Sequence, residues 1–208
     1  MKIARSASLR TWNTPPHKRT AISRDECSNN GEMRDLWERL SKFLDLAQMD
    51  LIVNRLASKE ELRIVHSEKH VNQNLGISPL ARVSENPSPT EISIISARKA
   101  AAAVSDMALA IHTKQIANGF AFFRPGGSHA EKDRAESGAH FNSIAVAIKI
   151  LHEHYSKIRV LVVSWDEHHS NGTQNIFYSD SDVLHISIHK SNFQSQNGKI
   201  EEVCIFRG

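Results

Sequence analysis

The strongest structural signal in the chain is a run of four apolar residues, Val160 to Val163, that leads into a polar cluster. Three of the four are β-branched, and such a run predicts a strand buried on both faces, as in a parallel sheet. Asp166 and His168 follow the run, and then a turn cluster at Ser170 to Gly172. Ligands of open α/β sheets bind beyond the carboxyl ends of the strands. The run therefore predicts a buried strand that ends at a binding edge.

Asp166 and His168 lie two residues apart, so both side chains can reach one metal ion from this strand end. Asp and His are suitable ligands for Zn²⁺, but a catalytic zinc takes three protein ligands and keeps one position open. On the residues alone, a polar strand end with hydrogen-bonded side chains is the simpler interpretation.

Two further strands are expected to end at the same edge. Gly119 to Phe123 is a second candidate buried strand, followed by a loop that carries His129, and Val183 to His189 is a third. The order strand, helix, strand, loop, strand predicts an α/β fold with a parallel, doubly wound sheet. His129, Asp166 with His168, and His189 are therefore expected to converge.

Helical patterns occupy the first part of the chain. Met33 to Ala47 repeats apolar residues at intervals of three and four. Ser58 and Glu61 predict a capping box for a second helix that runs to about His66. His66 and His70 share a helix face, and we expect them to be a surface or helix-end pair.

Two more helices are predicted in the second half. Residues 90–112 form a long Ala-rich stretch suited to close packing against a sheet. Residues 142–155 form another, and a loop rich in Pro, Ser and Asn is predicted at 75–89, directly before the Ala-rich helix. The residues of the later helix that we expect to face inward are Ile144, Ala145, Ala147, Ile148 and Leu151.

Residues 1–30 are predicted to be a basic, disordered tail, and residues 31–208 to be the folded domain. The first 24 residues carry six Lys and Arg residues and no acidic residue, together with Pro15 and Pro16. An organelle transit peptide and a weak nuclear signal at His17 to Arg19 are alternatives for this segment.

Composition excludes several classes of protein. A net charge of +3 and 6% aromatic residues do not indicate direct binding to nucleic acid. No apolar run is long enough for a transmembrane helix, so no membrane partner is expected. The two cysteines, Cys27 and Cys204, lie too far apart in sequence to indicate a disulfide framework.

Several segments resemble the class II zinc-dependent histone deacetylases, in particular the class IIa branch. The specific ones are Gly119 to His129, Asn142 to Ala147 and Val160 to Tyr178. Flanking segments agree with them: Leu36 to Leu40, Val65 to His70 and Ser96 to Arg98. The resemblance implies a three-layer α/β sandwich of the arginase/deacetylase type.

The resemblance also implies a reaction, the hydrolysis of the acetyl amide on a lysine side chain by a zinc-bound water. Asp166 and His168 match two of the three zinc ligands. His129 matches the general base, the second histidine of a pair, and Asn171 matches the residue that orients it. A monovalent cation, K⁺, is implied next to the zinc, held by backbone groups of Ser164, Asp166, His168 and Ile188 and by the Ser187 hydroxyl.

Several positions depart from the family pattern. The first histidine of the pair is Ser128, and the aspartate that holds it is Ser164, so both partners of one hydrogen-bonded unit are absent. The phenylalanine that lines the acetyl-lysine tunnel falls on Gly138. The other departures are Ser137 and Ser170 at glycine positions, Ala139 at a cysteine and Gly126 at a proline.

The third zinc-ligating aspartate and the residue that faces the zinc belong to a C-terminal portion beyond Gly208, so the domain is expected to be partial. A sheet cut partway leaves an edge strand and exposed apolar surface. We therefore expect an oligomer through the sheet edge, or a partner that covers it.

Two functions are consistent with these features. The first is a deacetylase-family protein with weak or no catalysis, acting on histones or other acetylated-lysine proteins. The alternative is a non-catalytic module with the deacetylase fold that binds co-repressors or acetylated tails. Either is expected in the nucleus and cytoplasm.

Overall fold

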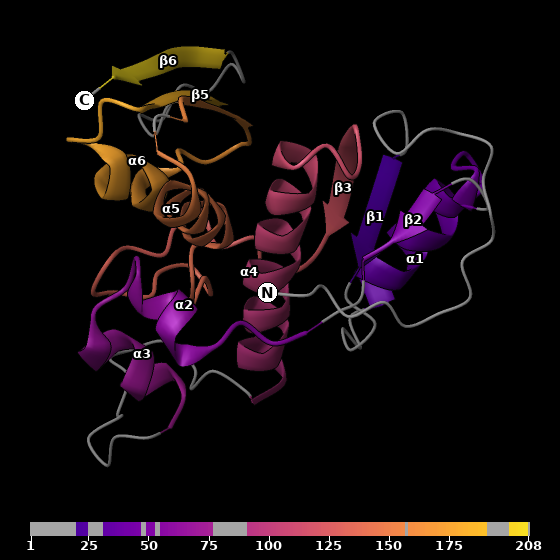
Figure 1. Cartoon of the computed structure of the whole chain (residues 1–208), viewed down its shortest axis with the longest axis horizontal. Helices are drawn as coiled ribbons and strands as arrows, with labels where there is room; N and C mark the ends of the chain where they lie inside the picture. The colour runs from indigo at the N-terminus through magenta and orange to yellow at the C-terminus, as the bar shows by residue number, and fades with distance from the viewer. Residues whose placement is uncertain are drawn as a thin grey trace.

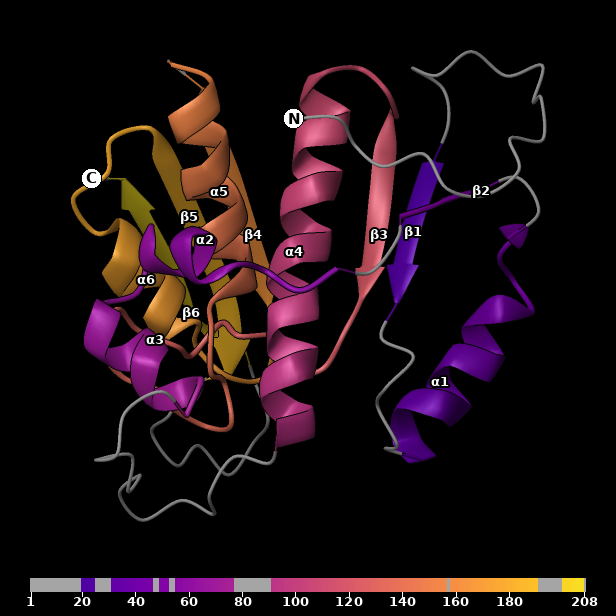
Figure 2. The ribbon, with the colours of Figure 1, turned by 60° about the horizontal axis from the view of Figure 1, so that its bottom comes forward.

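The computed structural model describes residues 20–24, 31–46, 49–52, 55–76, 91–156, 158–190 and 200–207. Two three-stranded sheets lie on either side of a long helix, α4 (Glu91–His112), as Figures 1 and 2 show. The strands are β1 (Thr20–Arg24), β2 (Met49–Leu51), β3 (Asn118–Phe122), β4 (Val160–Trp165), β5 (Val183–Lys190) and β6 (Ile200–Arg207). The other helices are α1 (Gly31–Ser41), α2 (Lys59–Arg63), α3 (Glu68–Asn74), α5 (Ser143–His154) and α6 (Asn171–Phe177).

The first sheet has the order β2-β1-β3 and is parallel throughout. Its central strand, β1, corrects the sequence prediction, which assigned these residues to a disordered tail. Ala21 and Ser23 are fully buried in it, because β1 has a neighbour on each side and α4 lies close by. The rest of the predicted tail lies outside the described residues.

The second sheet has the order β4-β5-β6, with β4 parallel to β5 and β6 antiparallel to β5. The α/β class, the parallel pairing and the strands at Val160 and Val183 are thus confirmed, while β6 departs from an all-parallel sheet. The prediction that β4 is buried on both faces is wrong. Leu161 and Val163 are 58% and 40% exposed, because helices cover only one face of this sheet.

The predicted strand at Gly119 is confirmed as β3, but its burial is not. Asn118, Gly119 and Phe120 are exposed, since β3 is the edge strand of its sheet. The turn predicted at Ser170 to Gly172 is instead the start of a helix: Ser170 is the N-cap of α6, which begins at Asn171.

The helix predictions hold with local corrections. α4 and the capping box of α2 are confirmed: the Ser58 hydroxyl accepts from the Glu61 N–H and the Glu61 carboxylate accepts from the Ser58 N–H. α1 ends at Ser41, before the predicted limit at Ala47. α5 has its expected bounds, except that Ile144 is 37% exposed and does not face inward.

The main core lies between α4, α5 and the covered face of the second sheet. Phe141 is its largest fully buried side chain, and Leu62 of α2 is buried with it. Small residues on α4, including Ala97 and Ala101, allow α4 and α5 to pack closely. None of the described helices is long and apolar enough to cross a membrane.

His66 and His70 are the clearest error in the sequence prediction, since they are buried rather than on the surface (1% and 2% exposed). His66 donates from Nδ1 to the Glu131 carbonyl (2.8 Å) and accepts at Nε2 from the Asn142 N–H (3.0 Å). His70 donates from Nε2 to the His140 carbonyl (2.8 Å). Both rings therefore join α2 and α3 to the segment before α5.

Burial favours the neutral forms of His66 and His140. Desolvation and the nearby His70 lower the pKa of His66 from 6.5 to about 4, and the same two causes lower the pKa of His140. In the unfolded chain these groups titrate near their ordinary pKa, so the unfolded state takes up protons first as the pH falls.

The protein is therefore expected to lose stability on acidification. The contribution of neutral His66 to the free energy of unfolding is fully present above its unfolded pKa of about 6.5 and is lost as the pH falls toward about 4. At pH 5 the loss amounts to about 2 kcal/mol. Urea unfolding followed by tryptophan fluorescence at neutral pH and at pH 5 measures this. His66→Gln should flatten the pH dependence, and an equal slope in both proteins would contradict the assignment.

Candidate functional site at the carboxyl ends of β3 and β4

The predicted site residues lie in two segments, the loop after β3 and the loop after β4. His129 belongs to the first and is half-buried, while Asp166 and His168 belong to the second and are exposed. The rings of His129 and His168 lie side by side, with 6.1 Å between their centroids. The structure thus brings together the two loops that the sequence predicted to converge.

The start of α6 packs directly against the loop that carries His129. A Cβ atom on Gly172 would lie 2.4 Å from the Ala130 carbonyl oxygen and 2.7 Å from the His129 carbonyl carbon, so only glycine fits at this contact. The Thr173 N–H also donates to the Ser128 carbonyl (3.1 Å). This close approach places Asn171, the first residue of α6, beside His129.

Asn142 also joins the start of α6 to the loop that carries His129. Its side-chain oxygen caps α5 by accepting from the Ala145 N–H (3.0 Å). Its amide group donates to the Ala130 carbonyl (3.3 Å) and to the Thr173 hydroxyl (3.1 Å). Since Asn142 is fully buried, loss of these bonds would leave polar groups without partners.

Asn171 and His129 form the predicted pair. The Asn171 amide group donates to Glu131 (3.3 Å) and Glu136 (3.1 Å), which turns its oxygen toward Nδ1 of His129 at 2.7 Å. Nδ1 of His129 must then carry the proton, and Nε2 is left as an acceptor. A neutral imidazole with a free Nε2 can accept a proton or bind a cation.

Glu131 and Glu136 were not found from the sequence. Arg134 donates to both carboxylates (3.1 and 3.0 Å), and Asn175 donates to Glu131 (3.0 Å). The spacing of charges in this loop does not predict the contacts with Asn171, because the two carboxylates reach Asn171 only when α6 packs against the loop.

Asp166 makes no comparable arrangement. Its carboxylate accepts from the N–H of the next residue, Glu167 (2.6 Å), at an exposed position. Within the described part of the chain, no three His, Cys, Asp or Glu side chains are grouped to hold a metal ion. A catalytic zinc needs three protein ligands, so Asp166 and His168 alone do not fit one.

Two of the residues predicted to hold a monovalent cation, Ser164 and Ser187, lie on the covered face of the second sheet. The Ser187 hydroxyl lies 3.2 Å from Nδ1 of His169 and 3.0 Å from Nδ1 of His189. Ser164 is the register partner of Ser187, and its hydroxyl lies 3.3 Å from Nε2 of His185. Burial, followed by the nearby His169, lowers the pKa of His185, so the His185 ring stays neutral near pH 7.

His189 therefore does not join His129 at the strand ends, contrary to the predicted convergence of three strand ends. It lies 4% exposed against His169, with 4.6 Å between the ring centroids. Ile188, the next residue back along β5, points to the opposite face of the sheet.

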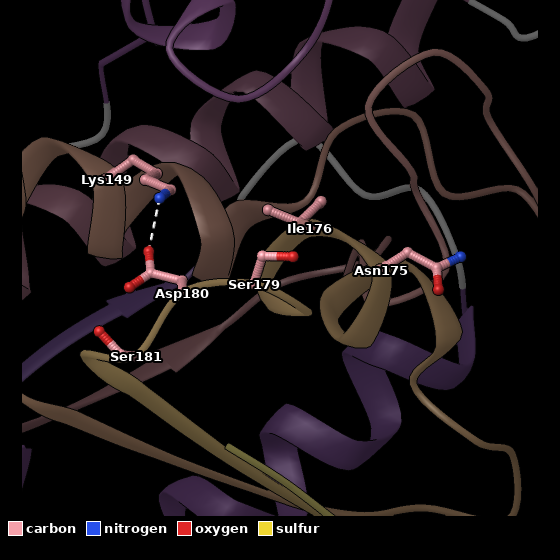
Figure 3. A pocket seen from close by; sticks show the side chains of 6 residues that line it. All are labelled: Lys149, Asn175, Ile176, Ser179, Asp180 and Ser181. Atoms are coloured by element: carbon pink, nitrogen blue, oxygen red, sulfur yellow. Dashed lines mark hydrogen bonds and ion pairs between the residues drawn. The ribbon is translucent and has the colours of Figure 1, made fainter. Parts of the chain in front are cut away.

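A separate pocket of about 390 Å³ opens between α5 and the end of α6 (Figure 3). Its lining residues are Lys149, Asn175, Ile176, Ser179, Asp180 and Ser181. Lys149 donates to Asp180 across it (2.6 Å). Burial raises the pKa of Asp180, but the bonds from Lys149 and the Asp182 N–H outweigh this and leave that pKa below its ordinary value. The two charges thus satisfy one another, and we assign no ligand to the pocket.

Comparison with known proteins agrees with the resemblance. A family model of the histone deacetylase domain matches residues 26–206. Human histone deacetylase 7 is 34% identical over 203 residues, covering 83% of this chain and 21% of that protein. Human histone deacetylase 9 is 32% identical over 203 residues, covering 83% and 20%. Histone deacetylase 4 of Caenorhabditis elegans is 30% identical over 220 residues, covering 88% and 25%.

The chain is similar to solved structures as well. The crystal structure of the HD domain of HDA15 superposes with a TM-score of 0.75 and is 31% identical, covering 88% of this chain and 57% of that chain. The chain thus spans a fifth to a quarter of the length of the curated relatives and little more than half of the solved domain.

The hydrogen bonds around Asn171 predict the tautomer of His129. In the unaltered protein, ¹⁵N chemical shifts should report a proton on Nδ1 and a free Nε2. Asn171→Leu should populate the other tautomer, because the acceptor for Nδ1–H is removed. Asn175→Leu is the matched control, since the Asn175 amide donates to Glu131 and not to His129 among the described residues. An unaltered protein with the proton mainly on Nε2 would contradict this geometry.

Proposed function

Because the chain belongs to the histone deacetylase family, we propose that it keeps the frame of a deacetylase site while its own residues leave it catalytically weak or inactive. Membership rests on the family model that matches most of the chain and on the similar solved domain. The reaction of the family, hydrolysis of the acetyl amide on lysine, is the activity in question.

The observation that carries this proposal is the pair Ser128 and Ser164. The resemblance implies a histidine and an aspartate at these positions, a unit that holds a charged imidazole next to the substrate. A serine hydroxyl stays neutral, so it supplies neither the charge nor the proton acceptor. Ser164 lies instead against His185, and the carbonyl of Ser128 accepts from Thr173.

The loop of Ser137 and Gly138 supports the same conclusion. Both residues are exposed and have positive φ angles, 51° and 77°. A Cβ on Gly138 would meet no atom within 4 Å, and glycine has no side chain to supply the apolar wall that the resemblance implies at this position. Ligand sites owe much of their affinity to such walls, and an acetyl-lysine chain would be bound less well without one.

The proposal extends to the cofactors. In the family, zinc polarises the acetyl carbonyl and activates a water. Asp166 and His168 are the two zinc ligands that we assign, and Nε2 of His129 is the proton acceptor. A K⁺ ion at Ser164, Ser187 and Ile188 would compete with His169 and His189 for the Ser187 hydroxyl. Weak binding of both ions by residues 1–208 follows.

A second candidate is a non-catalytic module that binds acetylated tails or co-repressors in the nucleus and cytoplasm. It is favoured by the contrast between the intact His129–Asn171 pair and the lost Ser128–Ser164 unit. The retained pair keeps hydrogen-bonding groups in fixed positions, and these can bind a polar group without catalysing its reaction. Such binding would be unaffected by metal chelators.

We expect the purified chain to hydrolyse acetyl-lysine and trifluoroacetyl-lysine peptides at the rate of a buffer blank, with Zn²⁺ present. Asp166→Ala should leave that rate unchanged. Turnover that EDTA abolishes and that Asp166→Ala removes would contradict the proposal. Binding of an acetylated histone H3 peptide, measured by fluorescence anisotropy with and without EDTA, would separate the second candidate from an inert protein.

A further inference from the structure

A cluster of three buried histidines lies next to the candidate site. His66, His70 and His140 are 1%, 2% and 6% exposed, and the first two rings stack with 5.0 Å between their centroids. Phe141 lies against both of these rings, at 5.6 and 5.9 Å. His66 follows α2 and His70 belongs to α3, and Figures 1 and 2 show these helices on the same side of α4 as α5 and α6.

His66 is bound at two points to the segment that carries His129. We call residues 127–141 the site loop. Its Glu131 carbonyl accepts from Nδ1 of His66 (2.8 Å), and the N–H of Asn142, directly after the loop, donates to Nε2 (3.0 Å). Both ring nitrogens are thus engaged, and the second bond requires that Nε2 carry no proton.

A proton on Nε2 of His66 would place two donors against each other. The imidazolium ion has N–H groups at both nitrogens and no acceptor, so the Asn142 N–H would lose its partner. Both residues are buried, and a buried donor without a partner is unfavourable. The conflict is removed when the site loop moves away from the ring.

The charged groups of the elements around His66 are engaged with one another. Arg63 at the end of α2 is paired with Glu68 at the start of α3. In the site loop, Arg134 donates to the carboxylate of Glu131 (3.1 Å). The charges of the core helices also have partners, namely the Ala57 carbonyl for Arg98 of α4 and Asp180 for Lys149 of α5.

The titratable groups next to His66 are His70, His140 and Asp133. Burial, followed by His70, lowers the pKa of His66 from 6.5 to about 4, although backbone carbonyls of the site loop and the Asp133 carboxylate oppose this change. Burial, followed by His70, also lowers the pKa of His140. His66 is therefore neutral near pH 7 and takes up a proton in acid.

Release of Asn142 also loosens the contact between the site loop and α6. The Asn142 amide group donates to the Ala130 carbonyl and to the Thr173 hydroxyl, one residue after His129 and two residues after Asn171. The 2.7 Å contact between His129 and Asn171 depends on this packing of α6 against the loop. A change at His66 is thus carried to the pair through one side chain.

We propose that His66 is a proton-sensitive positioning residue for the candidate site: a proton on its Nε2 releases the site loop and separates His129 from Asn171, while the first sheet stays paired. The first sheet is independent of this titration because β1, β2 and β3 contain no histidine. The opening is local, and so differs from an overall loss of stability in acid. It also goes beyond the proposed function, because it applies whatever the site binds.

Amide hydrogen exchange of residues 1–208, followed by NMR at pH 7 and pH 5, tests this opening. The Thr173 N–H is bound to the Ser128 carbonyl across the contact that should open. After correction for the intrinsic pH dependence of exchange, its protection should fall about twentyfold, the factor set by a pKa of about 6.5 in the released ring and about 4 in the buried ring. Amides of β1, which pairs on both sides, should lose less than about twofold.

Two variants assign the response to His66. His66→Gln keeps an acceptor for the Asn142 N–H but does not titrate, so the fall in Thr173 protection should shrink to about twofold or less. His154→Gln is the matched control and should keep the full response, since His154 is exposed on α5 and binds the Ile150 carbonyl. In the unaltered chain, the ring ¹⁵N shifts of His66 should titrate with the same midpoint as the loss of Thr173 protection, and this measurement does not depend on the folding of a variant.

Three results would overturn the proposal. One is a Thr173 amide whose protection does not change, or changes as much as that of β1. Another is a His66→Gln protein that responds to pH as the unaltered chain does. The third is a His66 ring that stays neutral at the pH where the Thr173 amide loses its protection.

Discussion

The hydrogen bonds of one buried side chain, Asn142, join the parts of the molecule on which the candidate site depends. It caps α5, binds the Ala130 carbonyl beside His129 and binds Thr173 of α6. Its own N–H is bound by His66, which is itself buried. The position of His129 thus depends on Asn142 and His66, to which we assign no catalytic role. His66 must be neutral to accept the Asn142 N–H at Nε2. A site held in this way can keep its geometry after its reactive partners are lost.

Local patterns predicted the elements that depend on local interactions. The capping box at Ser58 and the Ala-rich stretch of α4 are encoded within a few residues, and both are confirmed. The burial of side chains could not be predicted from local sequence, because it depends on which faces other elements cover. The apolar run of β4 has the composition of a doubly buried strand, yet one of its faces is open. His66 and His70 have a polar local sequence and became core residues because backbone groups of distant segments satisfy them.

The candidate site shows the same division. The pairing of His129 with Asn171 followed from the resemblance, and the structure brings the two residues together. Glu131 and Glu136, which fix the Asn171 amide, could not be predicted because they reach it only through the close contact at Gly172. The half of the site formed by α6 and its neighbouring loop is ordered by a connected set of bonds. The half formed by Asp166 and His168 is exposed and incomplete, and it lies in the loop that follows β4, the strand whose outer face is also uncovered.

The central claim is that residues 1–208 preserve the His129 side of a deacetylase site without assembling a zinc site by themselves. The most direct measurement is competition for Zn²⁺ between the chain and a chromophoric chelator of about micromolar affinity, at neutral pH where metal-binding histidines are deprotonated. We predict that the chain takes no stoichiometric zinc from the chelator and that Asp166→Ala and His168→Ala behave like the unaltered protein. One equivalent of tightly bound zinc, lost in either variant, would contradict the account.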